Sequence, residues 1–497
     1  MISRNTAQDR KAVRIVLQYA PCVLVLFIIV TLPVLFGAVH PIVQAGYVAL
    51  ILVGLGGWLL FELPALPLSC IPWRWLLVPL GLILYLAFQA APLPLALVRM
   101  LSPARGERVD MANSLAHTDQ TLAALGENGV AGLQAAVVAL ALIVLFVALS
   151  SLLRREQGFA TAILYAVASV GLLEGIYGLL QIMNPGIGIL WLPLKSQAAH
   201  GTIIYKNQYA ALMNICWPMA VAAALVAIDP SPGKAADGQG NRMPAARRLA
   251  RFLANLRPQV PIFFFAAGIA ILAVLFSLSR GGILSMLVVS ILLCIFLPLS
   301  WRLKLVAMTV FAAFIGAYGS LLGLEGIVAR FGGIEHSGSA RLQIYQASLP
   351  MLFDHWLTGT GFDSFKLLSG VYLKEFPEKV LFDRVHSDYL ELAIELGLPA
   401  ATLFFGWIAI GVVQTGRRLS GVRVADDDAR KRQIVGTAAF CALLGFLVHG
   451  TVDFGWRLLV NMVYAVTLLA LISWALTDPA ELGRDGQVAE LAEDEDE

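Results

Sequence analysis

Apolar residues recur along the chain in uninterrupted runs of membrane-spanning length. A helix needs roughly 17 to 25 mostly apolar residues to cross about 30 Å of hydrocarbon. Runs of this kind occur at 17–37, 41–61, 75–91, 131–153, 160–182, 203–227, 259–278, 281–299, 303–322, 390–414, 434–451 and 458–476. They are apolar on every side, whereas barrel strands would alternate apolar and polar residues. The pattern predicts an all-α polytopic membrane protein with about twelve transmembrane helices.

Composition supports this fold class. Of the 497 residues, 59% are hydrophobic and only 14% are charged, which excludes one water-soluble core of ordinary composition. The net charge of +2 gives no reason to expect nucleic acid as a partner. The five cysteines lack CxxC spacing, so neither a metal site nor a disulfide is assigned to them. The first apolar run follows a basic start without a small-residue cleavage site, so we expect it to be the first helix.

The basic residues predict an orientation. With a cytoplasmic N-terminus and twelve crossings, most of the 35 Lys and Arg residues fall on the inner side. Residues 1–497 are then a single polytopic domain with both termini inside. Two inner segments stand out, the basic loop 229–258 and the acidic tail 478–497. Two outer loops are long, 92–130 and 323–389.

The second outer loop has the pattern of a folded lid. Its segment RLQIYQASLPMLFDHW (341–356) carries Leu342, Tyr345, Leu349, Leu352 and Trp356 at helical spacing, which predicts an amphipathic helix. GTG at 359–361 then turns the chain back. The first outer loop opens with a stretch that predicts a short interfacial helix followed by a polar turn. It holds no catalytic or metal-ligand spacing.

Two cationic segments lie at ends of predicted helices. Arg280 stands in SLSRGG (277–282), where two glycines would allow close approach of a ligand, and the guanidinium fork suits phosphate. Lys206 and Asn207 stand near the outer end of the sixth helix. Boundary cations tend to face a polar cavity rather than lipid. The alternative for both segments is that the side chains extend to lipid headgroups.

A titratable cluster precedes the tenth predicted helix. Asp383, Arg384, His386 and Asp388 fall within six residues. An imidazole can take a proton from a hydroxyl near neutral pH, so His386 is a candidate general base. Two alternatives stay open: an interfacial histidine satisfied by a neighbour, or a metal site formed by His386 with Asp383 or Asp388.

Three further charged residues have less specific interpretations. Glu174, inside the fifth predicted helix, is either a packing contact or a proton site. Asp453 and Arg457 flank the turn between the last two helices, where a local ion pair would account for both.

Several motifs together resemble the O-antigen ligase-related family, which includes O-antigen ligases and polymerases of surface polysaccharides. The motifs are GTIIYKNQYAALM, SLSRGG, SARLQIYQASLP with HWLTGTGFDSF, and HSDYLELAIELGLPA. They occur in the expected order, whereas the first 200 residues match only as a hydrophobic pattern. Lys206 departs from the family, in which arginine is more usual at this place.

The resemblance implies a glycosyltransferase at the periplasmic face of the bacterial inner membrane. Such an enzyme moves a glycan from undecaprenyl pyrophosphate to an acceptor sugar hydroxyl, without metal or cofactor. It implies that Arg280 and Arg341 bind pyrophosphate and that His386 is catalytic. Lys206, Asn207, Arg384 and Asp388 are further candidates for substrate binding.

The resemblance leaves the acceptor open, which is another repeat unit for a polymerase and lipid A-core for a ligase. The long first outer loop slightly favours a polymerase. The main alternative is a membrane transporter of a small anion or solute, which twelve helices would equally allow. Transporter charges should cluster near the midplane, whereas the candidate residues here map to the outer edge.

Overall fold

The computed structural model confirms the all-α membrane fold. It describes residues 19–62, 73–156, 158–193, 196–228, 257–305, 334–374, 376, 382–422 and 426–477, together with 309, 312, 313, 316 and 317. Eight helices in these ranges are long and apolar enough to cross a membrane. Three shorter apolar helices, Tyr19–Val34, Arg280–Phe296 and Leu459–Ala475, accompany them. Most of the predicted helix 303–322 and of the loop 229–258 lies outside the described residues. The acidic tail 478–497 lies wholly outside them.

The N-terminal half begins with the helix Tyr19–Val34 and contains most of the described helices that are long enough to cross a membrane. Its elements are η1 (Phe36–Ala38), α2 (Pro41–Ala49), η2 (Leu50–Leu55), α3 (Gly56–Glu62), α4 (Trp73–Ala90), β1 (Leu93–Pro94), α5 (Leu95–Leu101), α6 (Pro103–Ala116), β2 (Leu122–Ala123), α7 (Gly129–Arg155), α8 (Phe159–Met183), η5 (Pro185–Ile187) and α9 (Lys206–Ala227). Strands β1 and β2 pair antiparallel and close the first outer loop.

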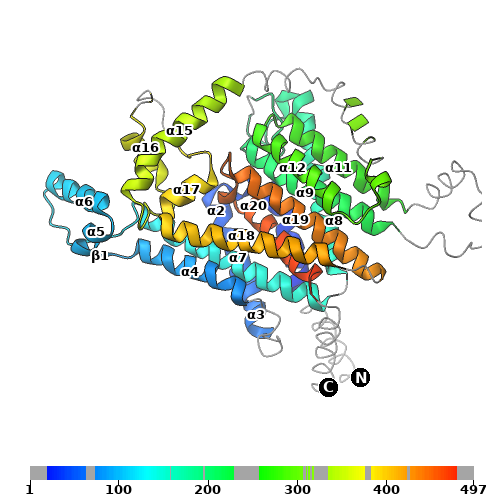
Figure 1. Ribbon diagram of the computed structural model, residues 1–497, viewed down its shortest axis with the longest axis horizontal. Helices are drawn as coiled ribbons and strands as arrows, with labels where there is room; N and C mark the ends of the chain where they lie inside the picture. The colour runs from blue at the N-terminus through cyan, green and yellow to red at the C-terminus, as the bar shows by residue number, and fades with distance from the viewer. Residues whose placement is uncertain are drawn as a thin grey trace, which may run out of the picture.

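The C-terminal half contributes the remaining membrane helices and further helices within residues 334–396. Its elements are α11 (Gln259–Phe276), α12 (Arg280–Phe296), α15 (Ile334–Asp354), α16 (Phe365–Tyr372), α17 (Asp388–Leu396), α18 (Leu398–Gly421), α19 (Asp427–Gly450), η8 (Gly455–Arg457) and α20 (Leu459–Ala475). Helices α5, α6, α15, α16 and α17 gather at one end of the long helices (Figure 1).

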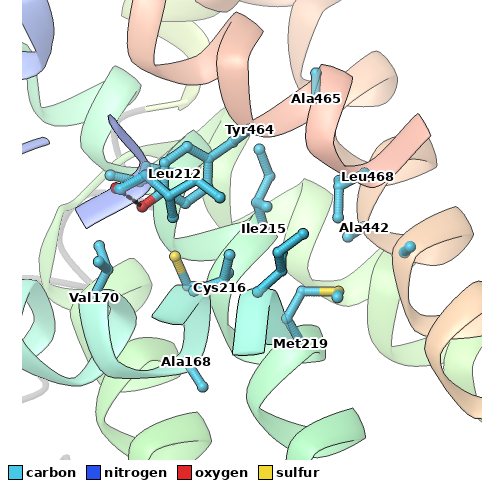
Figure 2. Packing of buried hydrophobic residues seen from close by; sticks show 14 of the residues in the cluster. Ala168, Val170, Leu212, Ile215, Cys216, Met219, Ala442, Tyr464, Ala465 and Leu468 are labelled. Atoms are coloured by element: carbon cyan, nitrogen blue, oxygen red, sulfur yellow. Dashed lines mark hydrogen bonds between the residues drawn. The ribbon is translucent and has the colours of Figure 1, made fainter. Parts of the chain in front are cut away.

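Helix α9 forms the centre of the bundle. In the most apolar stretch of 18 residues of this helix, 89% of the residues are buried inside the protein. Leu212, Ile215, Cys216 and Met219 of α9 pack among side chains of α8, α19 and α20 (Figure 2). Small residues allow this close packing: a Cβ on Gly171 of α8 would lie 2.6 Å from the Cβ of Cys216. The ends of α9 are therefore fixed relative to its neighbours.

The tenth predicted helix, 390–414, is two helices rather than one. Gly397 has φ +78°, a left-handed conformation that glycine adopts without a steric penalty, and it separates α17 from α18. A Cβ here would also lie 2.7 Å from the backbone nitrogen of Gly359, so the two glycine turns pack directly together. The titratable cluster consequently precedes a short, separate helix instead of the mouth of a membrane helix.

The amphipathic helix predicted at 341–356 exists as α15, but only part of its predicted apolar set, Tyr345 and Leu352, packs against the buried cluster. Ile344, Met351 and Leu352 pack inward against α16 and α17, whereas Leu342 and Trp356 are more than half exposed. The cause is that this helix has apolar residues on two faces. Periodicity alone does not decide between them.

The two loops predicted to lie outside, 92–130 and 323–389, pack against each other. The amide of Glu127 in the first loop donates to the carbonyl of Thr360, and Gly126 lies against Gly361. The buried Gln89 at the end of α4 donates to the carbonyls of Thr358 and Glu395. The first loop therefore supports the GTG turn, together with the α17–α18 junction behind it.

Candidate functional site

His386 is held by its backbone on both sides. Its carbonyl accepts a hydrogen bond of 2.7 Å from the hydroxyl of Tyr345 on α15. The preceding amide, of Val385, donates to Glu391, and the following residue, Ser387, caps the first turn of α17. His386 itself has φ +64°, which is uncommon outside glycine and costs on the order of 1–3 kcal/mol. The surrounding contacts thus hold the backbone of His386 in a conformation that the free chain would avoid.

Asp453 lies behind this imidazole, in the turn between α19 and α20. Its Oδ1 atom is 4.0 Å from Nδ1 of His386, and its Oδ2 atom is 3.7 Å from a guanidinium nitrogen of Arg341. The side chain is 1% exposed. Burial raises the pKa of Asp453, but His386, His449, the amide of Phe454 and Arg341 together outweigh burial and hold the pKa below its ordinary value. The group is therefore a buried carboxylate.

Arg280 begins α12 beside the same turn. The side chain of Ser279 caps this helix by accepting a hydrogen bond from the amide of Gly282. A Cβ on Gly281 would lie 2.8 Å from a methyl carbon of Val452 and 2.9 Å from the ring of His449. The first turn of α12 is thus packed directly on the segment that leads to Asp453. The positive end of the helix dipole adds to the charge of Arg280 here.

Lys206 and Asn207 begin α9 on the far side of Phe454. The ring of Tyr205 is 5.7 Å from that of Phe454, which is in turn 5.3 Å from the imidazole of His386. Gln208 donates a hydrogen bond of 2.9 Å to the carbonyl of Phe454. The start of α9 is therefore one aromatic ring away from His386. The structure brings the segments of Lys206, Arg280, Arg341 and His386 together at one end of the bundle.

Arg384 and Asp388 have protein partners. Arg384 pairs with Asp363 at 2.6 Å and with Glu391 at 3.1 Å. The carboxylate of Asp388 accepts a hydrogen bond of 3.1 Å from the amide of Trp456, and burial raises its pKa well above the ordinary value. These contacts hold the chain around His386. Nearby, Asp383 pairs with Lys366 at the surface.

The local ion pair expected between Asp453 and Arg457 is absent from the described residues. Asp453 faces Arg341 and His386, whereas Arg457 pairs with Glu391 and Glu395 on α17. The two residues diverge because η8 turns the chain between them. Sequence reasoning therefore missed Asp453 as a carboxylate beside His386, although its place directly after a membrane helix was a usable signal.

Glu174 proves to be a packing partner of the loop before α9. Its carboxylate accepts hydrogen bonds from the amide and the hydroxyl of Thr202, at 2.8 and 2.7 Å. Its backbone carbonyl accepts one from Tyr209 at 2.8 Å. The packing contact, one of the two interpretations of Glu174, is thus present. It also fixes the approach of the chain to Lys206.

The arrangement combines an imidazole backed by a carboxylate with arginines from two different helices. Such a group can bind an anion at the ends of α9 and α12 and can accept a proton beside it. His386, Asp453 and Arg280 lie at or next to helix ends, and Arg341 lies within α15.

Comparison with known proteins agrees with the motifs. A family model described as O-antigen ligase matches residues 265–405, the region that contains Arg280, Arg341 and His386. Lys206 and Asp453 lie outside the match. A search of curated proteins found no matching relative. Over residues 265–405, the chain is thus similar to the O-antigen ligase family, in agreement with the resemblance of its motifs.

Proposed function

We propose that this protein is an inverting glycosyltransferase at the periplasmic face of the bacterial inner membrane. It takes a glycan from undecaprenyl pyrophosphate and joins it to a sugar hydroxyl of the acceptor. The family match supports a polysaccharide ligase or polymerase. The observation that carries the finer proposal is that Asp453 lies between His386 and Arg341. Its carboxylate is 4.0 Å from the imidazole and 3.7 Å from the guanidinium.

The proposed reaction uses this arrangement of three side chains. His386 accepts the proton of the acceptor hydroxyl, and Asp453 stabilises the imidazolium that forms. The hydroxyl oxygen bonds to the anomeric carbon while the bond from that carbon to the pyrophosphate oxygen breaks. Attack opposite the leaving group inverts the anomeric configuration. No covalent glycosyl-enzyme forms.

The departing polyprenyl pyrophosphate carries the developing negative charge. Arg280 and Arg341 supply fixed positive charge with planar forks that match phosphate oxygens. Aligned donors of this kind contribute about 3 to 4 kcal/mol each in other enzymes. Lys206 and Asn207, at the start of α9, are the proposed donor contacts on the other side of Phe454. Arg384 and Asp388 act indirectly, since protein groups occupy them.

Purified protein tests the proposal directly. Given carrier-linked glycan and an acceptor, it should release polyprenyl pyrophosphate and form a product whose anomeric configuration is opposite to that of the donor. The reaction should persist in EDTA. Retention of configuration, or activity that chelation abolishes and Mg²⁺ or Mn²⁺ restores, would contradict the mechanism.

A deletion strain tests the choice of acceptor. Without a polymerase, single repeat units should accumulate on the carrier; without a ligase, long chains should accumulate. The length of the first outer loop slightly favours a polymerase. Accumulated long chains would instead identify a ligase.

A further inference from the structure

Two segments distant in sequence are joined by several polar contacts beside the site. One is 384–395, which carries His386, and the other is 453–457, which carries Asp453. The amide of Asp388 donates to the carbonyl of Asp453 at 3.0 Å, and the amide of Trp456 donates to the carboxylate of Asp388 at 3.1 Å. The positions of the imidazole and its carboxylate therefore depend on the same joint.

Arg457 completes this joint from the side of η8. Its guanidinium is 2.5 Å from Glu395 and 3.1 Å from Glu391, both of which are fully buried on α17. It also lies over the ring of Phe362, 4.5 Å from the centroid. Because its side chain is only 10% exposed, these contacts are shielded from water, which strengthens the attraction between the charges.

Glu391 links Arg457 to the backbone next to His386. One of its carboxylate oxygens contacts both Arg457 and Arg384, each at 3.1 Å. The other accepts the amide of Val385 at 2.9 Å, one residue before His386. A single carboxylate thus ties the turn that holds Asp453 to the backbone that holds His386.

We propose that Glu391 and Arg457 are positioning residues for the reaction, which together set the separation of His386 and Asp453. The inference rests on the function proposed above and adds to it. Neither residue reaches the imidazole itself, so each acts through the chain. Buried ion pairs add little net stability compared with apolar packing, which favours a role in specifying geometry.

Kinetics of conservative variants test this inference. Glu391→Gln keeps an acceptor for Val385 but loses the charge that binds Arg457; Arg457→Lys keeps the charge but loses the fork. For each, kcat should fall about 10- to 100-fold, because a misplacement of about 1 Å can cost this much. The KM for carrier-linked donor should stay within about twofold. Arg99→Lys, in an exposed ion pair with Asp110 on the first loop, is the matched control and should behave as wild type.

A double-mutant cycle with His386→Ala separates positioning from a merely structural role. If Glu391 acts through His386, Glu391→Gln should cause less than about a twofold further loss when His386 is already alanine. An equal loss in both backgrounds would overturn the inference, as would wild-type kcat in Glu391→Gln. Should Arg457→Lys fail to accumulate in the membrane, Glu391→Gln alone decides. Wild-type transfer by His386→Ala itself would instead refute the proposed function.

Discussion

Nδ1 of His386 lies 4.0 Å from Oδ1 of Asp453, across the boundary between α17 and the α19–α20 turn. This distance is longer than a hydrogen bond. Catalytic hydrogen bonds often tighten only when substrate is bound. The buried carboxylate is therefore placed to orient the ring and to stabilise its protonated form.

Replacing Asp453 with asparagine should slow transfer. The amide would keep the size of the side chain but would not stabilise an imidazolium, so we expect kcat to fall at least about tenfold. Rates measured with saturating donor check this. Asp110→Asn, which removes an exposed carboxylate on α6, is the control. Equal rates for Asp453→Asn and wild type would exclude a role for the carboxylate.

Arginine at position 280 should not be replaceable by lysine. Arg280→Lys keeps the charge at the start of α12 but loses the planar fork. We therefore expect the rate of transfer to fall at least about tenfold, with normal accumulation in the membrane. Transfer rates across a range of donor concentrations measure the effect. Full activity in this variant would indicate that the side chain reaches lipid headgroups instead.

The interface between the outer loops should be sensitive to acid through His355. Arg108 can only donate, so Nε2 of His355 accepts at 2.9 Å and Nδ1 donates to Ser102 at 3.1 Å. Burial, and secondarily Arg108, lowers the pKa of His355 to about 4. The unfolded chain binds this proton at higher pH, so the stability contributed by neutral His355 is lost as pH falls from 6.5 towards 4.

Hydrogen exchange at residues 102–110 and 355–361 measures this loss. Exchange at pH 5, corrected for the intrinsic rate, should be faster than at pH 7. In a His355→Gln variant, which cannot titrate here, protection should change much less with pH. The same pH response in both proteins would assign the effect to other groups.

The orientation in the membrane can be tested with fusions. The charge bias predicts that reporters at 240 and 425 lie in the cytoplasm and a reporter at 370 in the periplasm. The last position lies in α16, in the same predicted loop as His386. Alkaline phosphatase activity from the fusion at 240 would reverse the topology and move the site to the cytoplasmic face.

The helices of this protein could be predicted from sequence because apolar runs long enough to span a bilayer have few other interpretations. Their breaks were harder to predict. Gly397 ends α17 because of its left-handed backbone and its packing on Gly359, 38 residues earlier, and no local pattern contains that contact. The buried face of α15 likewise depended on which of two apolar faces α16 and α17 would cover.

The candidate site was predictable in its charges and less so in its pairings. Arg280, Arg341 and His386 could be selected from motifs, and the fold brings their segments together. Asp453 and Arg457, four residues apart, were expected to pair with each other. The turn of η8 sends them to different partners, so the carboxylate behind His386 becomes visible only in three dimensions.

The role of His386 as the base is decided by the rate of transfer in His386→Ala. The variant should accumulate in the membrane and bind carrier-linked donor like wild type, because Arg280 and Arg341 remain. A positioned base contributes about 10² to 10⁴ in rate, so transfer from saturating donor should be at least about a hundredfold slower. His117→Ala, at an exposed histidine of the first outer loop, should transfer at the wild-type rate. A near-wild-type rate for His386→Ala would contradict the proposed mechanism.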